Sequence, residues 1–289
     1  MIDKAMLAAG IGALRQPVLP LVSMVEFLYL TGDFAAPAEV IAELPDEIET
    51  GYALYRDPGR ILTGCLDLLQ PLVDLKAGIP PRATVVDGEG HPVDAMTAAM
   101  ALVAQAVLTR ELEAINGALC APCGCTLCCV GPTAAMDQCY FEIPLVGAEI
   151  GLFAVEQVDT GLSRPVLLDD EPALRQDERP FYYRDTPVLL DWRQGEASLI
   201  LPRATACPNL AGSGRCRVYA DRPQVCRRPQ IFAYMLEPVE GQSADQPAFR
   251  LRQSLLAVVD CPYVELLRDE IAAYAAACEL ELVLRRNKA

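Results

Sequence analysis

Twelve cysteines in a chain of 289 residues limit how this protein can fold more than any other feature of its sequence. They are unevenly spread: six lie from Cys120 to Cys139, and the next four are Cys207, Cys216, Cys226 and Cys261. A cytosolic cysteine cluster is typical of metal binding or redox chemistry, whereas a disulfide framework is typical of small secreted proteins. We therefore expect thiolates from distant parts of the chain to meet around a shared cation.

The densest part of this cluster holds two CxxC spacings and one vicinal pair. Its cysteines are Cys120, Cys123, Cys125, Cys128 and Cys129. CxxC spacing lets two sulfurs reach one metal across a tight turn. A single CxxC also serves redox-active dithiols, and that chemistry is the alternative, but no βαβ pattern precedes the motif. We expect a metal-binding loop here, and we expect the glycines and prolines of residues 120–139 to turn the backbone sharply.

The later cysteines suit ligands that successive loops deliver to the same centre. Cys207, Cys216 and Cys226 are separated by nine and ten residues, which is unlike a short zinc knuckle. Cys261 precedes Pro262 at an expected helix start, where the helix dipole favours a thiolate.

An arginine-rich segment runs between these later cysteines. It contains Arg203, Arg215, Arg217, Arg222, Arg227 and Arg228, against the single acid Asp221. Four thiolates around zinc or around a four-iron cluster leave a charge of about −2. Guanidinium groups offset such charge and donate hydrogen bonds to sulfur, so we expect Arg222 and Arg227 to contact the cofactor. A solvated basic loop and a pocket for an anionic substrate are the alternatives.

The other cysteines and the single histidine are expected to be structural. Cys65 and Cys278 lie on apolar helix faces and are predicted to be buried. Cys139 is predicted to lie on the inward face of a strand and is a weaker ligand candidate. His91 lies in a turn-like string, and one histidine nearly excludes histidine-rich zinc sites and Ser-His or Cys-His catalysis.

The net charge of −15 excludes some partners. Such an acidic chain is repelled by phosphate backbones and anionic lipid, so neither nucleic acid nor membrane is expected as a partner. No transmembrane helix is expected, because the apolar stretch 19–30 is short and carries Glu26. Residues 5–14 have the length of a signal-peptide core, but Arg15-Gln16-Pro17 offers no small-residue cleavage site. We therefore expect a cytoplasmic protein with reduced thiols.

Hydrophobic periodicity predicts an α+β fold with a boundary near residue 117. Residues 1–117 are predicted to be mainly helical, and residues 118–289 to form a small mixed cysteine-cluster domain with long metal-binding loops. Helices are predicted over 61–73, 95–118 and 262–286, the last an amphipathic C-terminal helix. Strands are predicted over 139–145, 151–158, 187–192 and 197–201, and polar loops over 168–179 and 237–246.

The spacing of the cysteines resembles one known family. A CxxCC run, then Cys-Pro-x-Leu, then Gly-x-Cys-x-Val-Tyr-x-x-Arg-Pro-x-x-Cys-Arg resembles the YkgJ-type cysteine cluster family, described as a zinc- or iron-chelating domain. The resemblance covers residues 120–262, and its most specific part is 216–227. It implies seven ligands, which are Cys125, Cys128, Cys129, Cys207, Cys216, Cys226 and Cys261. The family's first cysteine falls at Pro122 in this chain, so either Cys120 or Cys123 must replace it.

Cysteine-only ligation suits both zinc and iron–sulfur clusters. We favour a [4Fe–4S] cluster, because structural zinc needs only four ligands and more thiols are present. Three functions follow: a structural or electron-transfer metalloprotein with a protein redox partner, an enzyme, or a metal carrier or assembly factor. The enzyme hypothesis draws on a similar cysteine pattern in the flagellin lysine methylase group, which implies an iron–sulfur cofactor. Against it, the chain contains no GxGxxG loop, and the sequence does not decide whether the protein is an enzyme.

Overall fold

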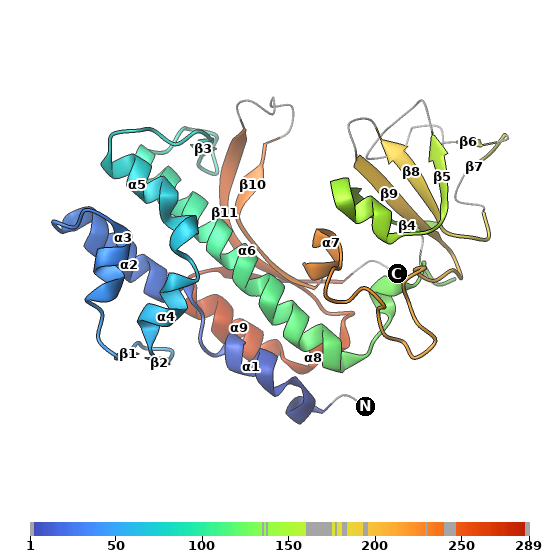
Figure 1. The fold of residues 1–289 in the computed structure, drawn as a ribbon, viewed down its shortest axis with the longest axis horizontal. Coiled ribbons are helices and arrows are strands. Elements are labelled where there is room, and N and C mark those ends of the chain that lie inside the picture. Colours follow the sequence, from blue (N-terminus) through green and yellow to red (C-terminus); the bar gives the residue numbers. More distant parts are fainter. Residues whose placement is uncertain are drawn as a thin grey trace. The chain divides into compact units, whose positions relative to one another are not determined.

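The computed structural model describes residues 3–134, 136, 138–159, 175–176, 178–180, 184–192, 196–228, 230–239 and 247–286. The chain divides into two compact units (Figure 1). Unit 1 consists of Met1–Pro122 and Gln230–Arg285, and unit 2 consists of Cys123–Pro229 and Arg286–Ala289. The sequence predicts residues 230–285 in the second domain, whereas in the structure they pack with the N-terminal residues.

Unit 1 is built around one long helix, α6, which carries a row of small and β-branched residues. The helices of this unit are α1 (Ala8–Leu14), α2 (Leu19–Thr31), α3 (Pro37–Ala42), α4 (Pro58–Thr63), α5 (Gln70–Lys76), α6 (Ala95–Cys123), α8 (Pro262–Leu266) and α9 (Arg268–Ala277), with 3-10 turns η1 (Lys4–Leu7) and η2 (Leu66–Leu69). Ala99, Val103 and Val107 of α6 join Val25 and Tyr29 of α2 in a single buried core. A spacing of four residues places these side chains on one face of each helix.

The sheet of unit 1 combines strands from both ends of the chain. Its central strand β11 (Ala248–Val258) pairs antiparallel with β10 (Ile231–Pro238) and parallel with β12 (Glu281–Arg285) and β3 (Thr84–Val86). A separate hairpin joins β1 (Glu47–Glu49) to β2 (Leu54–Arg56). Asn116 of α6 is 1% exposed; its amide donates to the Ile231 carbonyl at 2.7 Å and its oxygen accepts from the Tyr263 hydroxyl at 2.8 Å. These buried hydrogen bonds join α6 to β10 and α8.

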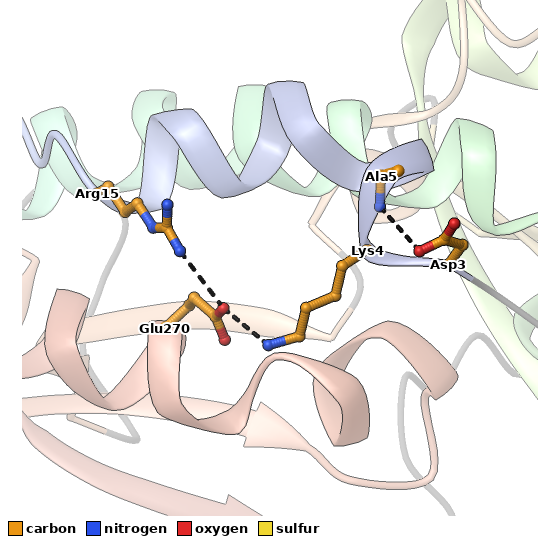
Figure 2. Close-up of polar contacts among 5 residues, drawn as sticks. All are labelled: Asp3, Lys4, Ala5, Arg15 and Glu270. Carbon is orange, nitrogen blue, oxygen red and sulfur yellow. Dashed lines mark hydrogen bonds and ion pairs between the residues drawn. The ribbon is translucent and has the colours of Figure 1, made fainter.

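Polar contacts also tie the first helices to α9. Glu270 of α9 accepts a hydrogen bond from the Lys4 ammonium at 2.9 Å and lies 3.8 Å from the Arg15 guanidinium (Figure 2). The Asp3 side chain accepts from the Ala5 amide and caps η1 (Figure 2). The hydrogen bond from Lys4 holds the pKa of Glu270 below its usual value, so this contact stabilises the fold above the usual carboxyl range and weakens in acid.

Unit 2 contains a four-stranded sheet in the order β4-β9-β8-β5. Its elements are η3 (Leu127–Cys129), β4 (Tyr140–Val146), η4 (Gly147–Leu152), β5 (Glu156–Asp159), β6 (Arg175–Gln176), β7 (Arg179–Pro180), β8 (Val188–Trp192), β9 (Glu196–Pro202) and α7 (Gln224–Arg227). Side chains alternate between two apolar clusters, with Leu199 and Leu201 in one and Ile200 in the other. Both faces of β9 are therefore buried.

The mixed α+β class is confirmed, but two of the predicted helices are wrong in extent. The predicted helix 61–73 is broken into α4, η2 and α5. The predicted helix 262–286 ends at Ala277, because Glu279 adopts a left-handed backbone (φ 55°) and the next residues form β12. Leucine and valine there pair with β11, a long-range contact that no helical period reveals.

The predicted strands are closer to the structure. Strands β4, β8 and β9 lie within a residue of the predicted ranges, whereas only the end of 151–158 is a strand and its start lies in η4. Glu237 and Pro238, at the start of the predicted loop 237–246, belong to β10. Residues 168–174 and 240–246 of the two predicted loops lie outside the described residues.

The stretch Lys4–Thr31 is long and apolar enough to cross a membrane, by length and composition alone. This finding differs from the sequence-based expectation, in which residues 19–30 are too short to span a membrane and residues 5–14 are a separate apolar stretch. In the structure 44% of the most apolar window is buried, and Leu21, Val22 and Val25 belong to the core of unit 1. The fold of unit 1 thus uses this stretch as a packing surface.

Candidate metal centre

The first cysteines of the cluster lie on a helix rather than in a loop. Helix α6 continues to Cys123, so Cys120 and Cys123 occupy its last turn and the metal loop expected over this part begins later. Gly124 follows with a left-handed backbone (φ 62°), the conformation that commonly ends a helix. The chain then turns through η3, where the Cys129 amide donates to the Thr126 carbonyl at 2.8 Å. Cys125, Cys128 and Cys129 therefore share one tight turn.

A short backbone ladder joins this turn to the Cys207 segment. The Cys207 amide donates to the Cys129 carbonyl at 2.8 Å, and the Gly131 amide donates to the Thr205 carbonyl at 2.8 Å. Between them Val130 and Ala206 form an antiparallel bridge. A Cβ atom on residue 131 would lie 1.9 Å from the Pro202 carbonyl oxygen, so only glycine fits there.

A tight hairpin brings Cys216 back towards Cys207. Leu210 and Cys216 form an antiparallel bridge, and the Arg217 amide donates to the Asn209 carbonyl at 2.8 Å. Gly214 near the hairpin tip has φ 79°, and a Cβ placed on it would be 3.7 Å from the Thr126 side chain. The hairpin therefore reaches the turn that carries Cys125, Cys128 and Cys129.

Cys226 lies in the single-turn helix α7. Its amide donates to the Pro223 carbonyl at 2.9 Å, and the preceding Gln224 amide donates to the Glu149 carboxylate at 2.7 Å. Glu149 belongs to η4, which packs against β9. The sheet thus supports α7 through a hydrogen bond that sequence spacing could not reveal.

The thiols of these segments influence one another's ionisation. A hydrogen bond from Cys129 lowers the pKa of the Cys128 thiol, and the same bond, with burial, raises the pKa of Cys129. Burial, followed by the charges of Cys128, Cys207 and Cys216, raises the pKa of Cys226 to about 12. Burial is also the main cause of the raised pKa of Cys207, to which Cys216 and Cys128 contribute.

Cys125 belongs to the same group, because its charge opposes the lowered pKa of Cys128. Six thiols are therefore linked through their effects on pKa, namely Cys125, Cys128, Cys129, Cys207, Cys216 and Cys226. Within the described part of the chain, no group of three His, Cys, Asp or Glu side chains is arranged so that it could hold a metal ion.

Arg222 is the buried cation of this region. It is 8% exposed, its guanidinium carbon lies 3.9 Å from the centre of the Tyr219 ring, and its Nε has no hydrogen-bond partner among the described residues. Its charge opposes the rise in the pKa of Cys226 and favours the thiolate of Cys128. Arg227 is exposed, and its Nε donates to the Arg222 carbonyl at 2.8 Å. Arg222 and Arg227 are thus neighbours, but only Arg222 is buried.

Two of the other predicted ligands, Cys120 and Cys261, belong to unit 1. Cys120 lies in α6, and Cys261 is buried at the N-terminus of α8. Cys123, the alternative to Cys120, is the first residue of unit 2, the unit of the six thiols. Cys139 directly precedes β4, and its carbonyl accepts from the Arg203 amide at 3.2 Å. Cys65 and Cys278 are buried, and burial raises the pKa of both thiols.

Tyr219 and Glu149 were not predicted as functional residues of this region, whereas Gly131 was among the glycines expected to turn the backbone there. The Val-Tyr pair after Cys216 was a usable signal for Tyr219, whereas Glu149 could be found only from the fold. No protein-family model, curated protein or solved structure matches this chain. The resemblance to the YkgJ-type family therefore stays a prediction based on the cysteine spacing.

Proposed function

We propose that this chain is a metal–thiolate protein whose centre lies in unit 2, with a [4Fe–4S] cluster as the favoured cofactor and zinc as the alternative. One observation carries the proposal: a backbone hydrogen bond of 2.8 Å from the Cys207 amide to the Cys129 carbonyl joins two cysteine-bearing segments that are far apart in sequence. The direction of the pKa shifts supports it, because thiols of these segments raise one another's pKa. The proposed donor set also includes Cys125, Cys128, Cys216 and Cys226. Cys123 is a further candidate ligand, because it lies close to Cys125 along the chain.

The chemistry of these donors fits a soft metal. Thiolates select zinc and iron–sulfur clusters over hard cations, and the single histidine, His91, lies in an exposed turn of unit 1. When bound, an iron–sulfur cluster supplies one-electron transfer and a zinc ion supplies a structural cross-link. For an iron–sulfur cluster, the proposal also predicts a cytoplasmic protein that exchanges electrons with this chain.

The chain's own residues would set how tightly the centre holds its metal. Thiols must lose their protons to ligate, and the raised pKa values of Cys129, Cys207 and Cys226 oppose that loss without a metal. The buried Arg222 would offset the charge of the thiolates, and its Nε is a donor that still needs a partner. Metal affinity should therefore rise with pH.

A redox-active dithiol is the second candidate. The hydrogen bond between Cys129 and Cys128 lowers the pKa of one vicinal thiol, which is exposed, and raises that of its neighbour. Dithiol oxidoreductases use such a low-pKa thiol beside a second one. This candidate requires no bound metal and predicts a protein that is colourless and metal-free.

Elemental analysis and visible absorption of anaerobically purified protein test the proposal directly. We expect bound iron with acid-labile sulfide and a brown colour, or bound zinc without colour. The Cys226→Ser variant should lose most of its metal, because one of the thiols that share the site is removed. The matched control is Cys65→Ser, which makes the same replacement at a buried thiol of unit 1.

Metal-free wild-type protein, or equal metal content in the two variants, would overturn the proposal. Comparing Cys120→Ser with Cys123→Ser then decides which of the two is a ligand. Only the ligand's variant should lose metal, since both positions lie in the last turn of α6 and their helical context is the same.

A further inference from the structure

Unit 1 contains a cavity that the proposed metal centre does not use. Its volume is about 550 Å³, within the range of sites for small organic molecules. The residues around it come from α2, the β1–β2 connection, α6, β10, β11 and the end of α9, all of them in unit 1. Leu19, Met100, Ala104, Met235 and Leu251 supply apolar wall.

One polar group in this wall lacks a partner. Glu26 of α2 is 2% exposed, and its Oε1 is buried without a hydrogen-bond partner among the described residues. An unpartnered buried carboxyl group is costly, and native structures rarely keep one without a function or a ligand. Burial raises the pKa of Glu26 to about 8, so the group is protonated at neutral pH unless a cation joins it.

The charge of the wall restricts which ligand can enter. The titratable side chains that line the cavity are Glu26, Tyr52, Cys278 and Glu279. The described lining contains no lysine, arginine or histidine, so an anionic ligand would find no counter-charge there. Tyr52 is exposed and offers an aromatic ring, to which a cation is attracted.

We propose that this cavity binds an organic amine, with its ammonium group on Glu26 and its apolar body against the wall formed by α2, α6 and β11. The ammonium supplies both the missing hydrogen bond and the counter-charge of the carboxylate. Entry of the amine ionises Glu26, whose proton leaves to solvent. The binding is independent of the metal centre, because every residue that carries it lies in unit 1.

Isothermal titration of the full chain with hexylamine, hexanol and hexanoate tests the proposal, because these probes share a tail and differ in the head group. We expect hexylamine to bind, hexanol to bind more weakly and hexanoate not to bind. Near pH 7, titrations in buffers of different ionisation enthalpy should show release of close to one proton per hexylamine. Equal binding of hexanol or hexanoate, or binding without proton release, would overturn the proposal.

Variants then locate the site. Glu26→Gln should weaken hexylamine binding about ten- to a hundredfold, the usual effect of losing a charged hydrogen bond, and should abolish proton release. Glu111→Gln is the matched control: Glu111 is half-buried and burial also raises its pKa, but it does not line the cavity and should leave binding unchanged. Ala104→Leu, which fills the apolar wall, should also block binding. Unchanged affinity in both Glu26→Gln and Ala104→Leu would refute the site.

Discussion

Two carboxyl groups buried in unit 1, those of Glu26 and Glu111, differ in how they are satisfied. Glu111 accepts hydrogen bonds from the Val18 amide at 2.9 Å and from the Tyr274 hydroxyl at 2.7 Å. Glu26 Oε1 has no such partner among the described residues. Burial raises the pKa of Glu111 to about 7 and that of Glu26 to about 8. The smaller rise at Glu111 follows from the hydrogen bonds, which favour its charged form.

Both residues should make the stability of unit 1 depend on pH. The folded state keeps the Glu26 proton up to about pH 8, whereas an unfolded chain loses it near 4.5. Between these values the folded state binds more protons, so the free energy of unfolding falls as pH rises. Glu26→Gln should remove the part of this decrease in the free energy of unfolding that is due to Glu26. At about pH 9 the variant should be more stable than the wild type by several kcal/mol, since one pKa unit equals about 1.4 kcal/mol. Urea denaturation across this pH range measures the effect.

An exposed carboxyl group provides the control for this prediction. Glu43→Gln, at the end of α3, should leave the pH dependence as in the wild type. A Glu26→Gln protein whose stability falls with pH as steeply as the wild type would show that Glu26 ionises normally in the folded state.

At the scale of elements, α6 organises unit 1 through side-chain amides as well as apolar packing. Strands β10 and β11 change register between Tyr234 and Leu236. Gln105 of α6 lies at this irregularity: its oxygen accepts from the Met235 amide at 2.9 Å and the Leu236 amide at 3.0 Å, and its nitrogen donates to the Ala233 carbonyl at 3.1 Å. The helix thus satisfies backbone groups near the register shift.

Replacing Gln105 should therefore weaken the contact between α6 and the sheet. Gln105→Leu keeps the size of the side chain but leaves the Met235 and Leu236 amides without an acceptor. We expect a loss of about 2 to 4 kcal/mol in the free energy of unfolding. Urea denaturation measures it, with Gln70→Leu as the control, because Gln70 is exposed and its side chain donates to Asp74 within the same helix, α5. Equal losses in both variants would contradict this role of Gln105.

At the scale of the whole molecule, the two units have different sources of stability. Unit 1 has a large apolar core formed by α2, α6 and their neighbours. Unit 2 has smaller apolar clusters around β9, and Cys207 packs against one of them. Its turn-rich thiol segments depend on a few backbone hydrogen bonds, so the proposed metal would contribute much of their stability.

Metal removal should therefore loosen unit 2 and spare unit 1. After treatment with a chelator under reducing conditions, the amides of Gly131 and Cys207 should exchange with deuterium at least about tenfold faster, because ligand binding stabilises only the state that binds it. Amides of the unit 1 core, such as Val103 and Leu255, should keep their protection. Unchanged exchange at Gly131 and Cys207 would mean that the metal, if bound, does not hold these segments together.

Local periodicity and residue type were enough to predict the α+β class, the strands β8 and β9, and the cysteine-rich segments in which a metal centre is expected. The tertiary structure decided which distant segments meet. Residues 281–285 became a strand because β11 offers them an edge, α6 extends to Cys123, and residues 230–285 pack with the N-terminal helices. It also decided that Glu26 lines a cavity. Contacts between residues far apart in the chain depend on how whole faces pack, and no local pattern encodes that choice.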